Sequence, residues 1–383
     1  MADVSAMRTN KPLVLAVARW PVGGIRTYLR DLFGSPPLAG YRFMLVSPDV
    51  DTMPEYLASG AYGDVEWIRT EASALSSIRA IAAATRRLRP AFVHSHGFIS
   101  GALAGVACKL TGAKHLLTVH DVLLDAQFKG FSGRLSELGL GSSLAFPDLV
   151  HCVTQDSLDN LTERYPWLRG LKRKTCVIPH GVDVARIVAA PRRDLKAELG
   201  LAPETRLLGF LGRFMAQKGF RVLMDALAAL KSDGLEPRQL RVLAVGTGGF
   251  LREDQERIAR MGLGEFFTFW PYQPDISSIL KGIDALVMPS LWEASGLLAM
   301  EAMVAGTAVI GTSCIGLRET LGGTPAVQVA PGDARALAAA LADFLEAPPF
   351  SAASVFGGTA EIRFDANRAF AKLGSMYQRI IAL

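Results

Sequence analysis

Short apolar runs alternate with amphipathic segments along the whole chain of 383 residues. Runs such as Leu13–Ala18 and Ala285–Met288 are apolar at nearly every position, which is typical of parallel strands covered on both faces. Segments between such runs, for example Ala74–Leu88, have apolar residues at helical spacing instead. This alternation predicts an α/β protein with parallel sheets.

The pattern falls into two series, which are separated by a polar, proline-containing stretch at residues 183–205. Strands of the first series are expected at Leu13–Ala18, Arg42–Ser47, Val65–Ile68, Phe92–Ser95, Leu116–Val119, Leu149–Val153 and Thr175–Ile178. Helices are expected between them at Ile25–Phe33, Ala74–Leu88, Ser100–Leu110, Gly133–Leu144 and Ser157–Arg164. Strands of the second series are expected at Leu207–Leu211, Val242–Val245, Phe267–Phe269, Ala285–Met288, Ala308–Ile310 and Ala326–Val329. We therefore predict two Rossmann-like, doubly wound domains, residues 1–182 and 183–365, and a last helix over residues 366–383.

Composition agrees with two folded domains. Hydrophobic residues make up 50% of the chain and charged residues 20%, which is a globular composition. No run of 18 apolar residues occurs, and the first residues lack the apolar core of a signal peptide, so neither a transmembrane helix nor a leader is expected. The four cysteines are scattered without a CxxC spacing, which favours buried thiols and a cytoplasmic location.

The net charge of +5 lies entirely in the first half of the chain. Residues 1–180 carry 20 Lys and Arg against 15 Asp and Glu, whereas residues 181–383 carry 21 of each. The basic residues cluster at Arg79, Arg86, Arg87 and Arg89 and again at Lys172, Arg173 and Lys174. Solubility is the simplest explanation, and attraction to an anionic membrane surface or a phosphorylated acceptor is the functional one. Nucleic acid is not expected as a partner, because no basic stripe with interleaved aromatics occurs.

The segment Pro289–Met303 places two carboxylates, Glu293 and Glu301, eight positions apart. The apolar run before it predicts a buried strand, and the stretch from Ser295 to Ala305 predicts a helix. Glu293 would then lie in the turn and Glu301 in the helix, up to ~12 Å away. Backbone N–H groups at the start of this helix would lie between them, where anions bind.

This segment resembles the Glu-x7-Glu signature of retaining glycosyltransferases with the GT-B fold, family 4. Gly212–Gly219, with the sequence GRFMAQKG, resembles the G-R-x4-K-G element of the same family, whose Arg and Lys bind the donor diphosphate. Two fixed cations at this place would stabilise the negative charge of a leaving diphosphate without a metal. Ile178–Asp183, with the sequence IPHGVD, resembles the I-P-x-G-V-D element at the hinge of the family.

Further elements of the resemblance follow strands in both halves. Trp20–Ile25 resembles the family's glycine-rich loop, and Leu117–Asp121 resembles its T-x-H-D segment. Val93–Gly97 resembles its V-H-x-H segment; alternation puts both histidines on one strand face, which favours packing over metal binding. Gly246–Phe250 resembles a G-x-G-x turn near the nucleotide.

The resemblance implies a nucleoside-diphosphate sugar, UDP- or GDP-linked, as donor, and a glycan, lipid-linked or small-molecule hydroxyl as acceptor. It implies no cofactor and no metal. The N-terminal domain would bind the acceptor, the C-terminal domain would bind the donor, the two would face a cleft, and the last helix would pack back on the first domain. The implied catalytic residues are His120, Arg213, Lys218 and Glu293. The implied donor-binding residues are Gly23, Gly24, Gly246, Ser295, Gly296, Leu297, Leu298 and Glu301.

The chain departs from the family at Trp270–Tyr272, where glycine is usual beside the base, at Ser295, where an aromatic is usual, and at Ala308, where proline is common. Other interpretations stay open. An epimerase of the same fold and a catalytically silent sugar-nucleotide-binding protein both fit the motifs. An NAD-dependent oxidoreductase is disfavoured, because Leu251 stands where the third glycine of the dinucleotide fingerprint belongs. A glycosidase is disfavoured because its carboxylates flank a single bond.

Overall fold

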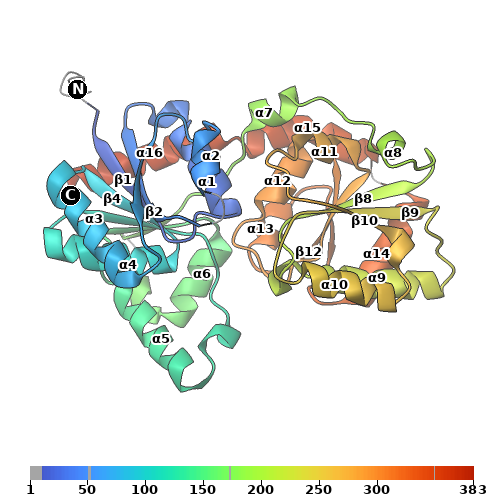
Figure 1. Ribbon diagram of the computed structural model, residues 1–383, viewed down its shortest axis with the longest axis horizontal. Coiled ribbons are helices and arrows are strands. Elements are labelled where there is room, and N and C mark those ends of the chain that lie inside the picture. The colour runs from blue at the N-terminus through green and yellow to red at the C-terminus, as the bar shows by residue number, and fades with distance from the viewer. Residues whose placement is uncertain (1–10, 51–52, 172–173, 349) are drawn as a thin grey trace. The chain divides into compact units, whose positions relative to one another are not determined.

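The computed structural model describes residues 11–50, 53–171, 174–348 and 350–383, and two compact units form within them. Unit 1 contains the chain up to residue 153, residues 157–179 and residues 367–383. Unit 2 contains residues 154–156 and 180–366. Each unit is built on one parallel sheet with helices on both faces, so the predicted α/β class is confirmed (Figure 1).

Unit 1 has a seven-stranded sheet with the order β3-β2-β1-β4-β5-β6-β7. The strands are β1 (Leu13–Ala18), β2 (Arg42–Pro48), β3 (Glu66–Thr70), β4 (Phe92–His96), β5 (His115–Val119), β6 (Leu149–Cys152) and β7 (Thr175–Val177). The helices are α1 (Gly24–Phe33), α2 (Met53–Ala58), α3 (Ala74–Leu88), α4 (Phe98–Thr111), α5 (Gly130–Ser143), α6 (Gln155–Arg164) and α16 (Ala366–Ala382).

Strand β1 shows why its continuous apolar run predicted a covered strand. On one face Leu15 packs with Ile81 of α3 and Ala104 of α4. On the other face Ala16 packs with Leu29 of α1. All six residues of β1 are buried, as expected for a parallel strand between two helical layers.

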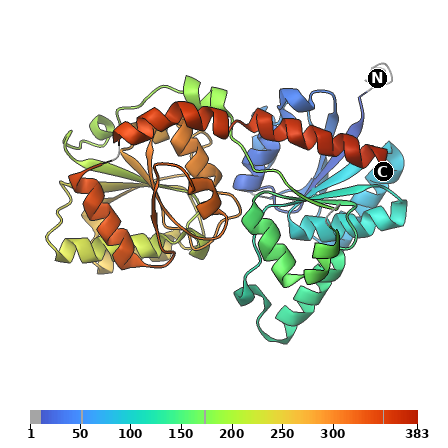
Figure 2. The same cartoon turned by 180° about the vertical axis from the view of Figure 1, so that it is seen from behind.

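Helix α16 completes unit 1 although the residues before it belong to unit 2. Its Tyr377 is fully buried, and the hydroxyl lies 2.8 Å from Nδ1 of His94 on β4. The Tyr377 ring packs edge-on against Phe92, with 4.8 Å between ring centroids. Near the end of the helix, Nζ of Lys114 donates to the carbonyl of Ile381 at 3.0 Å. Figure 2 shows α16 lying along the strands of unit 1.

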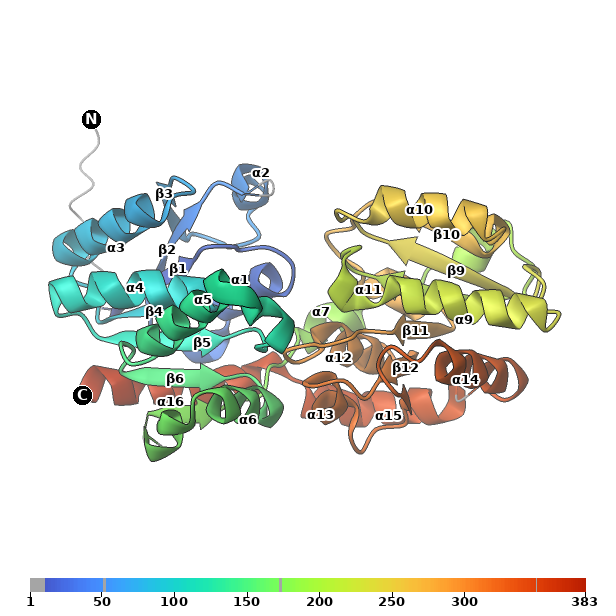
Figure 3. The ribbon, with the colours of Figure 1, turned by 90° about the horizontal axis from the view of Figure 1, so that it is seen from below.

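Unit 2 has a six-stranded sheet with the order β10-β9-β8-β11-β12-β13, and the strands of both sheets can be followed in Figure 3. The strands are β8 (Arg206–Leu211), β9 (Leu240–Val245), β10 (Phe267–Trp270), β11 (Ala285–Met288), β12 (Ala308–Thr312) and β13 (Val327–Val329). The helices are α7 (Val184–Ala189), α8 (Leu195–Glu198), α9 (Phe220–Ser232), α10 (Leu251–Arg260), α11 (Ser277–Gly282), α12 (Leu297–Val304), α13 (Leu317–Leu321), α14 (Ala334–Glu346) and α15 (Phe350–Arg363). Helices α9, α10 and α14 cover one face of this sheet, and α7, α11, α12 and α15 cover the other (Figure 1).

One expected helix is shorter in the structure. The helix predicted from Ser295 to Ala305 begins at Leu297 and ends at Val304. Gly296 has φ of 74°, a left-handed conformation that the first turn of a right-handed helix excludes, so Ser295 and Gly296 stay in the turn. The positive φ is what favours glycine at this position, and a Cβ there would also require Cδ1 of Leu317, 2.6 Å away, to move.

No helix in the described ranges combines the length and the apolar character that crossing a bilayer requires. In the first basic cluster, Arg79 lies in the middle of α3, Arg86 and Arg87 lie in its last turn, and Arg89 follows as the C-cap. In the second cluster, Lys172 and Arg173 lie outside the described residues.

Candidate active site

Glu293 lies in the turn between β11 and α12, and its carboxylate is held from two sides. Oε1 accepts hydrogen bonds from Nζ of Lys218 at 2.7 Å and from Oγ of Ser290 at 2.8 Å. The residue is only 6% exposed, so the charge-assisted bond to Lys218 compensates for the loss of water around the carboxylate. The pair fixes two predicted catalytic side chains in one place.

Lys218 comes from the turn after β8, which is tied directly to the turn after β11. The N–H of Leu291 donates to the carbonyl of Gln217 at 2.8 Å, and the Gln217 amide donates back to the carbonyl of Trp292 at 3.1 Å. Gly219 has φ of 64°, and a Cβ there would lie 1.9 Å from the carbonyl oxygen of Pro289. Glycine therefore allows the close approach of the two turns that brings Lys218 to Glu293.

Arg213 precedes this contact in the same turn, and the structure does not bring it to Glu293. Its side chain is exposed, and no hydrogen bond or ion pair is found for it among the residues that the structure describes. Lys218 and Arg213 therefore differ: one cation is anchored to a carboxylate, and the other lies in solvent.

Gly246 follows β9 and crosses the turn after β8. A Cβ on Gly246, which has φ of 146°, would lie 1.9 Å from the carbonyl oxygen of Gly212. The N–H of Gly212 donates to the carbonyl of Val245 at 2.9 Å, and the N–H of Phe214 donates to the carbonyl of Thr247 at 2.9 Å. The glycines thus let the carboxyl ends of β8 and β9 pack backbone to backbone, beside Arg213.

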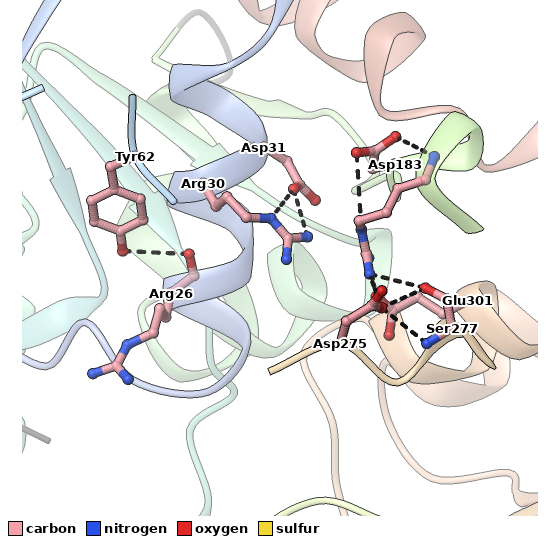
Figure 4. A network of polar contacts seen from close by, with 9 residues as sticks. Arg26, Arg30, Asp31, Tyr62, Asp183, Asp275, Ser277 and Glu301 are labelled. Atoms are coloured by element: carbon pink, nitrogen blue, oxygen red, sulfur yellow. Dashed lines mark hydrogen bonds and ion pairs between the residues drawn. The ribbon is translucent and has the colours of Figure 1, made fainter. Parts of the chain in front are cut away.

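Glu301 lies in α12 and binds an arginine that sequence reasoning missed. Its Oε1 accepts from Nη2 of Arg186 at 3.1 Å. The same guanidinium donates to Asp275 at 2.5 Å and to Oγ of Ser277 at 3.0 Å (Figure 4). The one sequence feature that singles out Arg186 is its place three residues after Asp183. The Asp183 side chain accepts from the Arg186 N–H and caps α7. That spacing predicts a helix start and gives no hint of the long-range partner.

Ser295 and Gly296 form the turn before α12, and Leu297 and Leu298 are the first residues of the helix. The first N–H groups of a helix have no partner within it, and the positive end of the helix dipole adds to their attraction for anions. Ser295 is buried, and its carbonyl accepts from the hydroxyl of Thr320, which holds the turn in place. Helix α12 has eight residues, and its first N–H groups are of the kind that attract anions.

His120 follows β5 in unit 1 and lies against two aromatic rings. Its Nε2 is 3.2 Å from Nδ1 of His96, within hydrogen-bond distance. Tyr28 of α1 packs edge-on against His120, with 4.8 Å between ring centroids. Gly23, with φ of 56°, precedes α1, and Gly24 is its first residue, so the predicted glycine loop leads into the helix that carries Tyr28.

Both histidines of the V-H-x-H segment are buried, as the packing interpretation expected. His94 Nε2 lies 2.7 Å from Oγ1 of Thr118, which lies 3.0 Å from Nδ1 of His151. Burial lowers the pKa of His94 well below its ordinary value, and burial lowers the pKa of His151 to about 4. His115, whose Nε2 is 2.7 Å from Oγ of Ser95, has its pKa lowered to about 3, again mainly by burial. Among the residues that the structure describes, no three His, Cys, Asp or Glu side chains form a group that could hold a metal ion.

The turns at the carboxyl ends of the unit 2 strands bring several charged groups together. Two cations, Arg213 and Lys218, lie in the turn after β8, and a helix start follows β11. Two buried carboxylates, Glu293 and Glu301, are each bound to a cation and are therefore held as hydrogen-bond acceptors. Ligands of doubly wound sheets bind at these strand ends.

Comparison with known proteins agrees with this geometry. Residues 22–186 match the family described as Glycosyltransferase Family 4, and residues 205–347 match the one described as Glycosyl transferases group 1. The 2-deoxystreptamine glucosyltransferase of Streptomyces kanamyceticus is 32% identical over 279 residues, which cover 67% of this chain and 68% of that protein. The D-inositol 3-phosphate glycosyltransferase of Actinosynnema mirum is 31% identical over 59% of this chain and 56% of its own length.

A solved structure extends the likeness to the whole fold. HepE from Anabaena, crystallised with UDP-glucose, superposes with a TM-score of 0.79 at 20% sequence identity. The superposition covers 95% of this chain and 100% of HepE. With both family matches and a relative aligned over two thirds of each chain, the chain belongs to glycosyltransferase family 4, a retaining family, and has the GT-B fold.

Proposed function

We propose that this glycosyltransferase uses a UDP-sugar donor and transfers the sugar to a hydroxyl of its acceptor without a metal. The observation that carries the proposal is the pair of half-buried Lys218 and buried Glu293, 2.7 Å apart, in the turns that follow β8 and β11. It joins the two sequence elements that resemble the family signature. UDP is favoured over GDP because HepE was crystallised with UDP and with UDP-glucose.

The diphosphate is the part of the donor that unit 2 is best suited to hold. When the bond from the sugar to the diphosphate breaks, negative charge develops on the β-phosphate. Arg213, exposed in solvent, grips phosphate oxygens as a fork, and Lys218 adds a fixed point charge. The N–H groups at Gly296 and Leu297 complete the cradle at the start of α12.

The two glutamates bind the ends of the donor. Both hydrogen bonds found for the Glu293 carboxylate among the described residues are on Oε1, which leaves Oε2 to accept from sugar hydroxyls. Glu301 accepts from the ribose hydroxyls, and Arg186 holds its carboxylate in place for that contact. Gly246, through its close packing on Gly212, shapes the turn that would lie beside the nucleotide.

Unit 1 supplies the acceptor site, with the loop at Gly23 and Gly24 and with His120. His120 contacts the donor sugar near its reacting carbon, as the resemblance implies. The departing phosphate takes the proton of the acceptor hydroxyl on the same face of the sugar, which gives retention without a covalent intermediate. Relatives are named for 2-deoxystreptamine and for inositol 3-phosphate, so a polyhydroxylated ring is the first acceptor class to test.

Binding and turnover test the proposal together. Thermal stabilisation by UDP, GDP, ADP and NAD in EDTA should single out UDP, since a ligand at 100 times its Kd stabilises by about 2.7 kcal/mol. Arg213→Ala and Lys218→Ala should lose that stabilisation and most turnover. The control is Lys231→Ala, because the one hydrogen bond found for the Lys231 ammonium among the described residues goes to the carbonyl of Gly262. Arg213→Ala with wild-type turnover would refute the phosphate role, and stabilisation by NAD alone would refute the donor class.

A further inference from the structure

Helix α5 carries an exposed apolar stripe. Phe131 is 86% exposed, Leu135 62% and Leu138 69%. Their spacing of four and three residues places them on one side of the helix. Figures 1 and 2 both show α5 projecting from unit 1 below the strands in those views. Three large apolar side chains on one helix face form a contact surface that no described residue of the unit covers.

The opposite side of α5 is packed so closely that the helix has a fixed rotation. Gly133 and Gly141 are buried there. A Cβ on Gly133 would lie 2.3 Å from the backbone carbon of Phe128, and one on Gly141 would lie 2.6 Å from Cε1 of Tyr165. The hydroxyl of Tyr165 also donates to the carbonyl of Glu137 at 2.9 Å. The stripe therefore faces outward because of this packing, and not because the helix is loosely held.

The charges on α5 are divided in the same way. Lys129, which precedes the helix, and Arg134, which lies beside Phe131 and Leu138 on the wheel, are both exposed. The one acidic residue of the helix, Glu137, lies toward the packed side and forms an ion pair with Arg164. The outward face thus combines apolar and cationic side chains and carries no carboxylate.

This combination selects one occupant. An apolar stripe flanked by Lys or Arg, without acidic residues, is the pattern of a helix that lies in the interface of an anionic bilayer. A second copy of the chain is a poorer match, because a two-fold contact would place the same cations against each other. The excess charge of the chain, +5, lies in residues 1–180 and acts in the same direction. We propose that the outward face of α5 binds an anionic lipid surface, with Phe131, Leu135 and Leu138 inserted among the lipid headgroups.

Such binding would hold unit 1 at the membrane and favour an acceptor hydroxyl presented there, as on a lipid-linked glycan. This consequence rests on the proposed function, whereas the lipid contact itself does not. The two are tested separately, because vesicle binding needs neither donor nor acceptor.

Vesicle co-sedimentation of the full chain tests the contact. We expect binding to vesicles of phosphatidylcholine with about a third phosphatidylglycerol, weaker binding to phosphatidylcholine alone, and loss of binding in high salt. Replacing Phe131, Leu135 and Leu138 by Ser should lower the partition coefficient at least about 10-fold. Each substitution removes an apolar side chain that would be buried in the lipid. The matched control replaces Val355 and Ile362 of α15, which are 81% and 60% exposed, by Ser and should bind as the wild type does.

Thermal stabilisation by UDP, measured on each variant, checks that the fold and the donor site are intact. Wild type that does not bind anionic vesicles would overturn the proposal, and so would a triple variant that binds as well as the wild type. Equal loss in the α15 control would overturn the assignment to α5. If the triple variant instead converts a dimer into a monomer, with no vesicle binding by either form, a second copy covers the stripe and the lipid proposal is wrong.

Discussion

Acidification from about pH 7.5 to about pH 5 should destabilise unit 1 through its buried histidines. Burial lowers the pKa of His115 to about 3 and that of His151 to about 4, whereas a histidine in the unfolded chain titrates near 6.5. Because the folded pKa values lie below the unfolded one, this stability is fully present above pH 6.5 and is lost as the pH falls toward 4 and 3. At pH 5 the unfolded state has taken up both protons and the folded state has taken up almost none.

The size of the effect follows from the same values. One pKa unit corresponds to about 1.4 kcal/mol, and pH 5 lies about 1.5 units below the pKa of a histidine in the unfolded chain. The free energy of unfolding at pH 5 is therefore lower by about 2 kcal/mol for each histidine and by about 4 kcal/mol for both. His94, whose pKa is also lowered well below its ordinary value, acts in the same direction. A loss of this size is a large part of the stability of an ordinary domain.

Hydrogen exchange of peptides from β4, β5 and β6 measures the opening free energy of unit 1 by itself. Exchange rates at both pH values, corrected for the intrinsic rate, should show that the opening free energy of the wild type falls by about 4 kcal/mol from about pH 7.5 to about pH 5. In His151→Asn this fall should be smaller by about 2 kcal/mol. Val150→Ala, which removes buried volume beside His151 on β6, should lower stability equally at both pH values. The reasoning would be refuted if the opening free energy of the wild type fell by less than about 1 kcal/mol between the two pH values. It would also be refuted if the fall in His151→Asn were as large as in the wild type.

Three further outcomes are expected. Glu293→Gln should lower kcat/KM at least about 100-fold while UDP still binds, because the carboxylate is lost from the sugar end; full activity would contradict its role. Gly219→Ala should lower the melting temperature by several degrees, because its Cβ would lie 1.9 Å from the carbonyl oxygen of Pro289; an unchanged melting temperature would argue against the close approach. Tyr377→Phe should cost about 1–3 kcal/mol in denaturant unfolding, because it takes from buried His94 a partner at 2.8 Å, and a neutral result would mean that the hydroxyl does not matter.

The strands were the most predictable part of this fold. Strands β1 and β11 have the bounds that their apolar runs predicted, because a strand covered on both faces leaves no polar position to blur its ends. Helix α15 was not predicted, because its sequence contains two adjacent glycines and lacks a clear apolar stripe. Its packing against α12 and neighbouring elements explains why it forms. The start of α12 was misplaced by two residues because helical spacing cannot reveal the positive φ of Gly296.

Side-chain partners were less predictable than strands. The sequence indicated that Lys218 and Glu293 belong to one site, and the structure brings them to 2.7 Å. It gave no sign that Arg186 binds Glu301, because the two are 115 positions apart and are joined only when α7 packs on α12. Capping and periodicity depend on residues close in sequence, so they do not predict pairs of side chains that only the folded chain brings together.

The place of α16 has a consequence for the order in which the chain folds during synthesis. Unit 2 is almost continuous in sequence and can bury its core once residue 366 has left the ribosome. Unit 1 begins first but finishes last, because Phe92 and His94 on β4 are covered only when Tyr377 arrives. Until then a nascent unit 1 exposes part of its central sheet while unit 2 is translated. Helix α16 is therefore needed to complete unit 1, and a chain interrupted before it would leave Phe92 and His94 without the cover of Tyr377.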